Sequence, residues 1–102
     1  MATPNDVFRA LADPTRRQIL QLLRDGPLAS GEIADRFPTA WSTVSRHLGV
    51  LRGAGLILME RDGTTIRYEL NTTVVQDLVS GLLDLTHDAR AAQPTPTGGD
   101  DA

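Results

Sequence analysis

Residues 41–52 combine small hydroxyl side chains with arginine and contain no carboxylate, which is the chemistry that a polyanionic surface requires. At 100° per residue, four side chains fall within about 60° of one direction and predict the buried face of a helix: Val44, His47, Leu48 and Leu51. The exposed face would then carry Ser42, Thr43, Ser45, Arg46 and Gly49. No Asp or Glu occurs between Pro38 and Met59.

Such a face has the properties of a helix that enters a nucleic-acid groove. Small side chains let a helix settle into a groove about 12 Å wide, hydroxyl groups donate to phosphates or base edges, and arginine pairs bidentately with guanine. The candidate DNA contacts on this helix are Trp41, Ser42, Thr43, Ser45, Arg46 and His47. His47 has a second interpretation as part of the packed face. An ordinary solvated helix surface is the alternative explanation for the whole pattern.

A predicted β-hairpin follows directly. After Gly53 and Gly55 end the helix, strands over residues 56–61 and 64–70 flank Asp62-Gly63, a dipeptide favoured where both central turn residues need positive φ. Apolar and polar residues alternate in the second strand, so one side is expected to pack against the core and the other, the wet side, to be exposed to solvent.

Two arginines of the hairpin could contact the DNA backbone. Arg61 is expected at the tip and Arg67 on the wet side. A hairpin edge protected by charge explains them equally well. The order of helix and hairpin favours the first interpretation, because a helix-turn-helix followed by a hairpin is a known DNA-reading arrangement.

Four segments together closely resemble the ArsR-type (ArsR/SmtB-like) winged-helix transcriptional regulators: FRALADPTRRQILQLL, GEIADRF, VSRHLGVLRGAGLI and DGTTIRYEL. The resemblance covers roughly residues 5–90. It implies a homodimer with the fourth helix in the major groove, the wing beside it, and the first and last helices at the dimer interface. The family usually has Ser or Thr at the position of Ala40, so Thr39 would have to supply the cap oxygen here. Trp41 and Ser42 stand where Arg or Lys and Pro are frequent, which changes the base preferences expected for this chain.

The fold class expected is mainly α, a winged helix-turn-helix of five helices plus a two-stranded wing. Asn5 or Asp6 can cap the first helix, and Asp13-Pro14 begins the second. Arg16 and Arg17 are expected to pair with acids of the first turn or of the partner subunit rather than with phosphate. Residues 1–90 would form the DNA-binding and dimerisation domain, and the Pro- and Gly-rich residues 91–102 a disordered tail.

The last predicted helix runs from Thr72 or Thr73 to about Arg90 and carries an apolar stripe wider than a single packing surface needs. A domain of this size also gains from association that covers further apolar surface. The residues expected at a homodimer interface are Val7, Phe8, Leu11, Val75, Leu78, Leu82 and Leu85.

The net charge of −3 is unevenly distributed. Residues 1–70 contain nine arginines and eight acidic residues, whereas residues 71–102 contain one arginine and five aspartates. An acidic end far from DNA costs little, because charges beyond about 8 Å are largely screened at physiological salt. The sequence has neither a membrane-spanning run nor a secretion signal, so a cytoplasmic location is expected.

Metal binding is an alternative mode of regulation. Cysteine is absent, which excludes thiolate sites. The resemblance implies a metal site between paired last helices in some relatives. At its four usual ligand positions this chain has Thr72, Val74, Leu85 and Asp88, and only Asp88 is a suitable ligand. A different cluster, Asp84, His87 and Asp88 at i, i+3 and i+4, could bind nickel or zinc. A solvated acidic helix end is the simpler interpretation.

Catalysis is not expected, because the two histidines lie in different elements and no phosphate loop, metal-hydrolase pattern or activated serine motif occurs. A winged helix used purely for protein contact is the remaining alternative. A steep salt dependence of DNA binding would separate the two, since a protein-docking module should lack it.

Overall fold

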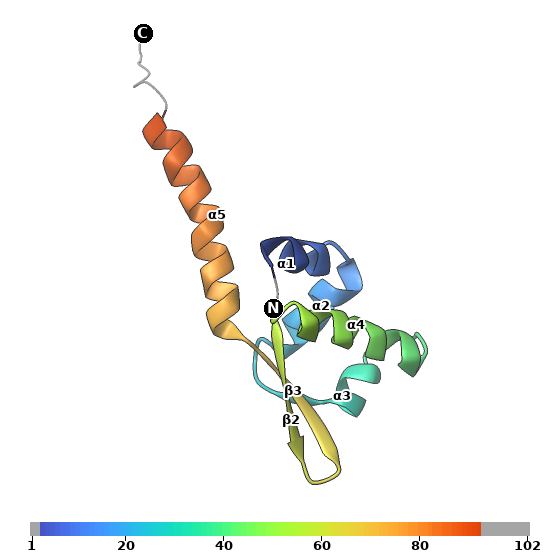
Figure 1. The fold of residues 1–102 in the computed structure, drawn as a ribbon. Coiled ribbons are helices and arrows are strands. Elements are labelled where there is room, and N and C mark those ends of the chain that lie inside the picture. The colour runs from blue at the N-terminus through green and yellow to red at the C-terminus, as the bar shows by residue number, and fades with distance from the viewer. Residues whose placement is uncertain (1–2, 93–102) are drawn as a thin grey trace. The chain divides into compact units, whose positions relative to one another are not determined.

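The computed structural model describes the backbone of residues 3–92 and the side chains of residues 3–86. The chain divides into two units, Met1–Thr72 and Thr73–Ala102. Its elements, drawn in Figure 1, are α1 (Pro4–Leu11), α2 (Pro14–Leu23), β1 (Leu28–Ala29), α3 (Ser30–Ala34), α4 (Trp41–Gly53), β2 (Ile57–Asp62), β3 (Thr65–Leu70) and α5 (Thr72–Ala92). The first unit contains everything up to the start of α5, and the rest of α5 lies in the second.

The first two helices begin at side-chain caps followed by proline. The Thr3 hydroxyl accepts from the Asp6 N–H at 3.2 Å, and the Asp6 carboxylate accepts from the Thr3 N–H at 2.9 Å. This reciprocal pair is a capping box, and it corrects the prediction that Asn5 or Asp6 caps the helix. At α2 the Asp13 carboxylate accepts from the Arg16 N–H at 3.1 Å, as the sequence predicts.

These caps give the fold an acid-sensitive component. The Arg16 N–H donating to Asp13, and the Thr3 N–H donating to Asp6, lower the pKa of each carboxyl below its ordinary value. A group with a lowered folded-state pKa stabilises the fold above its unfolded pKa of about 3.9, and that contribution is lost as the pH falls through the folded pKa.

We therefore expect the free energy of unfolding to decrease below about pH 4. Asp13→Asn should make this decrease shallower, because Asn keeps the cap but does not titrate. Urea unfolding at several pH values between about 7 and about 3 measures the free energy of unfolding of both proteins. Adding Asp6→Asn should flatten the profile further, and an unchanged profile in the double variant would show that the caps are not its source.

The core of the first unit draws on every helix and on β2. Its largest fully buried side chains are Ile19, Leu23, Ile33, Val44, Leu48, Leu51, Leu56 and Ile57. Helix α4 packs against α1, α2 and β2, while α3 packs against β1 and β3. The position of α4 is therefore set by three neighbours.

The wing belongs to a three-stranded antiparallel sheet of order β1-β3-β2, one strand more than the sequence predicts. The missed strand, β1, is two residues long and pairs Leu28 with Tyr68 and Ala29 with Arg67. Such a short strand shows no alternation and owes its conformation to its partner. Figure 1 shows the β2–β3 hairpin projecting beyond the helices of the first unit.

The hairpin turn lies one residue later than predicted. Asp62 pairs with Thr65, so the central residues are Gly63 and Thr64 rather than Asp62-Gly63. Gly63 has φ +64°, and primed hairpin turns need positive φ at their first central position.

Helix α5 ends at Ala92, so it includes the first two residues of the segment expected to be a disordered tail. The rest of that segment, residues 93–102, lies outside the described residues. Several large apolar side chains of α5 are exposed: Val79, Leu82, Leu83 and Leu85. Among the residues that the structure describes, no helix is both long and apolar enough to cross a membrane.

Candidate nucleic-acid interface

Helix α4 has the two faces that its sequence predicts. Val44, His47, Leu48 and Leu51 are all buried. The opposite side is exposed at Ser42, Ser45, Arg46 and Gly49, whereas Thr43 is half-buried. Trp41, at the first position of the helix, is half exposed. The exposed face is therefore made of small side chains with one arginine and one indole near the N-terminal end.

The N-terminus of α4 carries no side-chain cap. The N-cap residue is Ala40, and the Thr39 hydroxyl does not cap the helix, which corrects the prediction made for it. The first turn also lacks an acidic residue. The partial positive charge of this helix end is thus left uncompensated by side chains, and that favours an approaching phosphate.

Arg46 is available to a ligand. It is exposed, and within the described part of the chain its side chain makes no hydrogen bond or ion pair. A free guanidinium on a carboxylate-free helix face can pair bidentately with a guanine edge or with a phosphate.

His47 occupies the packed face and not the exposed one. Its exposed fraction is 7%, which fits the interpretation of a core residue rather than that of a direct DNA contact. Its Nδ1 atom lies 3.3 Å from Nη1 of Arg16 and 3.9 Å from Oδ2 of Asp13. We therefore remove His47 from the candidate contacts and treat it as a residue that positions α4.

Arg16 and Arg17 have structural partners, but not the acids that the sequence suggested. Arg16 donates to the carbonyls of Ala10 and Arg9, and Arg17 donates to the carbonyl of Leu11. The last carbonyls of a helix lack intrahelical donors, and cations near them are favourable. Both arginines thus attach α2 to the C-terminal end of α1.

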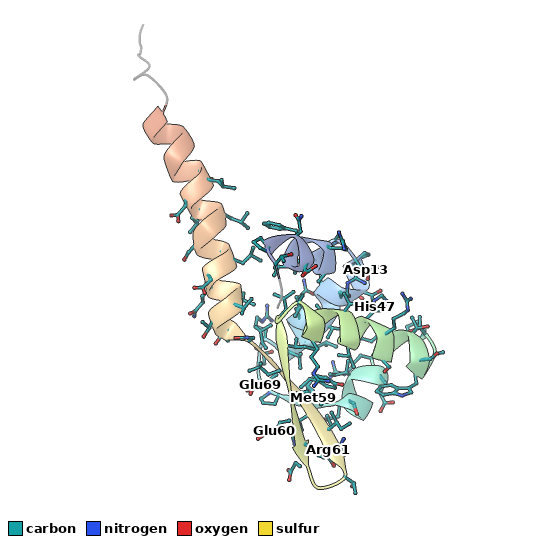
Figure 2. All side chains as sticks on the ribbon, viewed as in Figure 1. Asp13, His47, Met59, Glu60, Arg61 and Glu69 are labelled. Atoms are coloured by element: carbon teal, nitrogen blue, oxygen red, sulfur yellow. The ribbon has the colours of Figure 1, made fainter. Side chains whose placement is uncertain are left out.

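The two arginines of the wing lie on opposite faces. Directly paired residues share a face, and Arg61 opposes Ile66 on the side of Met59 and Tyr68. Arg67 opposes Glu60, and its Nε lies 4.0 Å from Oδ2 of Asp62. Figure 2 shows Glu60 and Glu69 on the other side of the hairpin from Met59 and Arg61. Arg67 is thus surrounded by carboxylates, whereas Arg61, among the described residues, has no ion pair.

This difference changes what each wing arginine should contribute. We expect Arg61→Ala to weaken binding to all DNA sequences alike and to lower the salt slope by about one unit, because it removes one phosphate contact. Arg67→Ala should have a smaller effect, since acidic neighbours already neutralise Arg67. Titrations of both variants at several salt concentrations measure the slopes. A larger loss for Arg67 would contradict the assignment of the two faces.

The sequence analysis also missed a cation beside the turn between α3 and α4. Arg36 is exposed two residues after α3 ends and, within the described residues, has no ion pair. It is a further candidate for phosphate contact. The sequence gives no signal for this, because Glu32 four residues earlier and Asp35 directly before it would suggest ion pairs, whereas in the structure the Glu32 carboxylate accepts from the Ala29 N–H.

The metal alternative concerns the far end of α5. Asp84 is exposed, while the side chains of His87 and Asp88 lie outside the described residues. Among the side chains that are described, no three potential ligands gather. The nickel or zinc site at these three residues therefore stays a prediction.

A short helix, a turn, a helix with a carboxylate-free exposed face, and a projecting hairpin with a free arginine define a winged-helix DNA-binding protein. The comparisons with known proteins agree. A family profile described as a helix-turn-helix domain matches residues 11–60. The chain is 45% identical over 80 residues to the transcriptional repressor SdpR of Bacillus subtilis. These 80 residues cover 78% of this chain and 89% of that protein.

Solved structures give the same result. A crystal structure of an ArsR family transcriptional regulator has a TM-score of 0.79 and 28% identity, covering 92% of this chain and 100% of that one. An ArsR-like transcriptional regulator from a Rhodococcus species has a TM-score of 0.74 and 29% identity, and the match covers 86% of this chain and 85% of that one. The chain belongs to the ArsR family of DNA-binding transcriptional regulators.

Proposed function

We propose that the chain acts in the cytoplasm as a homodimeric repressor that binds a short inverted-repeat operator, including one within or near its own promoter. The observation that carries this proposal is the exposed face of α4, where small side chains and a free Arg46 lie together with no carboxylate. The wing adds Arg61 on the face that carries no acids. The Bacillus subtilis relative is named a transcriptional repressor, and this supports repression rather than activation.

The homodimer rests on exposed apolar side chains. Phe8 of α1 is 48% exposed, and Leu82 and Leu85 of α5 are 45% and 66% exposed. Large apolar side chains in a row on one helix are stabilised by burial against a partner, at about 1.5 to 3 kcal/mol for a fully buried leucine. A two-fold dimer would place two α4 helices about one turn of DNA apart, which matches an inverted repeat.

Gel shifts on genomic fragments, followed by protection of the bound fragment from nuclease, test the proposal. We expect a fragment upstream of the protein's own gene to bind, with protection over two half-sites. A reporter joined to that fragment should be less active when the protein is present. An unchanged reporter would remove the repressor assignment, while failure of every fragment to bind would remove the operator itself.

Metal control stays a separate candidate. Calorimetric titration with nickel and zinc, repeated with His87→Ala, tests the site. Binding lost in the variant, together with a changed operator affinity, would support a metal-responsive regulator, because coupling requires the metal to distinguish two states of the dimer. Absence of binding by both metals would exclude it.

A further inference from the structure

A half-buried polar cluster joins α1, α2 and α4 inside the first unit. It consists of Asp13, Arg16 and His47 together with the carbonyl oxygens of Arg9 and Ala10, and we call it the Arg16 cluster. Figure 2 shows Asp13 and His47 close together where α2 meets α4. Arg16 and His47 are 31 positions apart in the chain, so no local spacing rule reveals the contact.

Within the Arg16 cluster, the Arg16 guanidinium makes the side-chain contacts that connect the three helices. Nε of Arg16 donates to the Ala10 carbonyl at 2.7 Å, and Nη2 donates to the Arg9 carbonyl at 3.1 Å. Nη1 lies 3.3 Å from Nδ1 of His47. The planar fork therefore connects the last carbonyls of α1 with the buried side of α4.

The geometry also fixes the tautomer of His47. Arginine has donors and no acceptor, so Nδ1 must accept the hydrogen bond from Nη1, and the imidazole proton must lie on Nε2. The Asp13 carboxylate lies 3.9 Å from the same Nδ1, too far for a hydrogen bond. Its Oδ2 atom instead accepts from the Arg16 N–H at 3.1 Å.

His47 directly follows Arg46 in α4, and the turn of about 100° between them takes its side chain from the exposed face into the packed face. A buried polar group is costly when it is unpaired, so Arg16, the one side chain within hydrogen-bond distance of the ring among the described residues, favours one orientation of the ring. A leucine at this position would pack without requiring any particular rotation of the helix.

Arg17 provides a natural comparison. Its Nη1 donates to the Leu11 carbonyl at 2.7 Å, so it also attaches α2 to the end of α1. Unlike Arg16, it has no contact with His47 among the described interactions. Arg16 makes two such bonds and Arg17 makes one, so if attachment of α2 to α1 were what matters for DNA binding, replacing Arg17 should cause a substantial part of the loss caused by replacing Arg16.

We infer that Arg16 and His47 form a positioning pair that sets the rotation of α4 relative to the end of α1, and thereby how well the protein distinguishes its operator from other DNA. The inference rests on the proposed function, in which α4 reads the operator. It adds a buried determinant of specificity that makes no contact with DNA.

The first test compares Arg16→Met with Arg17→Met and His47→Leu. Arg16→Met and His47→Leu should each lower operator affinity about tenfold, with a change of about twofold on random DNA. The double variant Arg16→Met/His47→Leu should bind the operator with an affinity within about twofold of that of the weaker single variant. The reason is that both substitutions remove the same contact. Arg17→Met should leave operator affinity within about twofold. Equal losses for Arg17→Met, or additive losses in the double variant, would overturn the pair.

The second test keeps the inference falsifiable if those variants are poorly folded. The Oδ1 atom of Asn can occupy the position of Nδ1, so His47→Asn should bind the operator about as well as the unmodified protein. The amide of Gln extends toward the position of Nε2, and His47→Gln should show the tenfold loss expected of His47→Leu. Better binding by the Gln variant would contradict the assignment.

Imidazole nitrogen chemical shifts of the DNA-free protein at about pH 8 report the tautomer directly. We expect Nδ1 to be unprotonated, and Arg16→Met to change its shift while Arg17→Met does not. A protonated Nδ1 would overturn the inference without any reference to DNA. Failure of the unmodified protein to prefer any operator would instead count against the proposed function, so the two failures are distinguishable.

Discussion

Replacing Leu82 and Leu85 by glutamate should give a folded monomer that binds the operator about 10² to 10⁴-fold more weakly than the unmodified protein. Both leucines are exposed on α5, at 45% and 66%, and the charges would prevent their burial against a second copy. A monomer holds one half-site only, so it loses the gain from linking two binding events. Sedimentation and operator titration measure the two effects.

The matched control places the same two charges on the opposite face of α5. Gln76 and Ser80 are exposed, and at 100° per residue they lie about 140° and 180° from the centre of the stripe that contains Val75, Leu78, Leu82 and Leu85. Gln76→Glu/Ser80→Glu should remain dimeric. If this control dissociates equally, added charge rather than the apolar face would be responsible. If the leucine variant stays dimeric, α5 is not part of the interface.

Arg46→Ala should reduce operator affinity about 10- to 100-fold, that is, by about 1 to 3 kcal/mol, while changing affinity for random DNA much less. The reason is that Arg46 is exposed, and unpaired among the described residues, on the helix face that we propose enters the groove. The loss should be concentrated at one base position when operator variants are compared. Competition titrations with single-base substitutions of the operator measure it.

Two further variants define how Arg46 acts. Arg46→Lys keeps the charge but not the bidentate fork, so it should recover little discrimination at that base position if Arg46 reads guanine. Arg24→Ala removes an exposed arginine that is paired with Asp25 at 3.6 Å after α2, and it should change operator affinity by about twofold or less. Full recovery by the lysine variant would mean that Arg46 contacts only the DNA backbone.

Periodicity predicted the two faces of α4 correctly because a rigid 3.6-residue repeat makes burial a local property. All four residues assigned to its inner face are buried. The apolar alternation of β3 likewise gave the correct inward side of the wing. The second and last helices also begin where the sequence predicts, at Asp13-Pro14 and at Thr72, because capping side chains and proline provide local signals.

The errors concern features that depend on distant residues or on one position of register. The turn is Gly63-Thr64 rather than the predicted Asp62-Gly63, because Asp62 pairs with Thr65 and extends the β-ladder by one residue pair. Strand β1 exists because β3 is beside it, and its two residues carry no pattern of their own.

The candidate site was predicted in composition but not in geometry. The sequence indicated which arginines belong to the wing, yet only the register places Arg67 among carboxylates and Arg61 on the other face. The sequence placed His47 on the packed face but also among the candidate DNA contacts, and the structure supports only the first of these. Its contact with Arg16 joins residues 31 positions apart, so the sequence could not name this partner.

The central claim is that the exposed face of α4 reads DNA sequence in a two-fold dimer. The most direct measurement compares the affinity for the identified inverted repeat with that for the same base composition in scrambled order, at about 150 mM salt. Specific regulators bind their sites about 10³-fold or more tightly than other DNA, and we expect a ratio of that order. We also expect the preference to fall when about five base pairs, half a helical turn, separate the two half-sites further. Equal affinity for the repeat and the scrambled DNA would contradict the account.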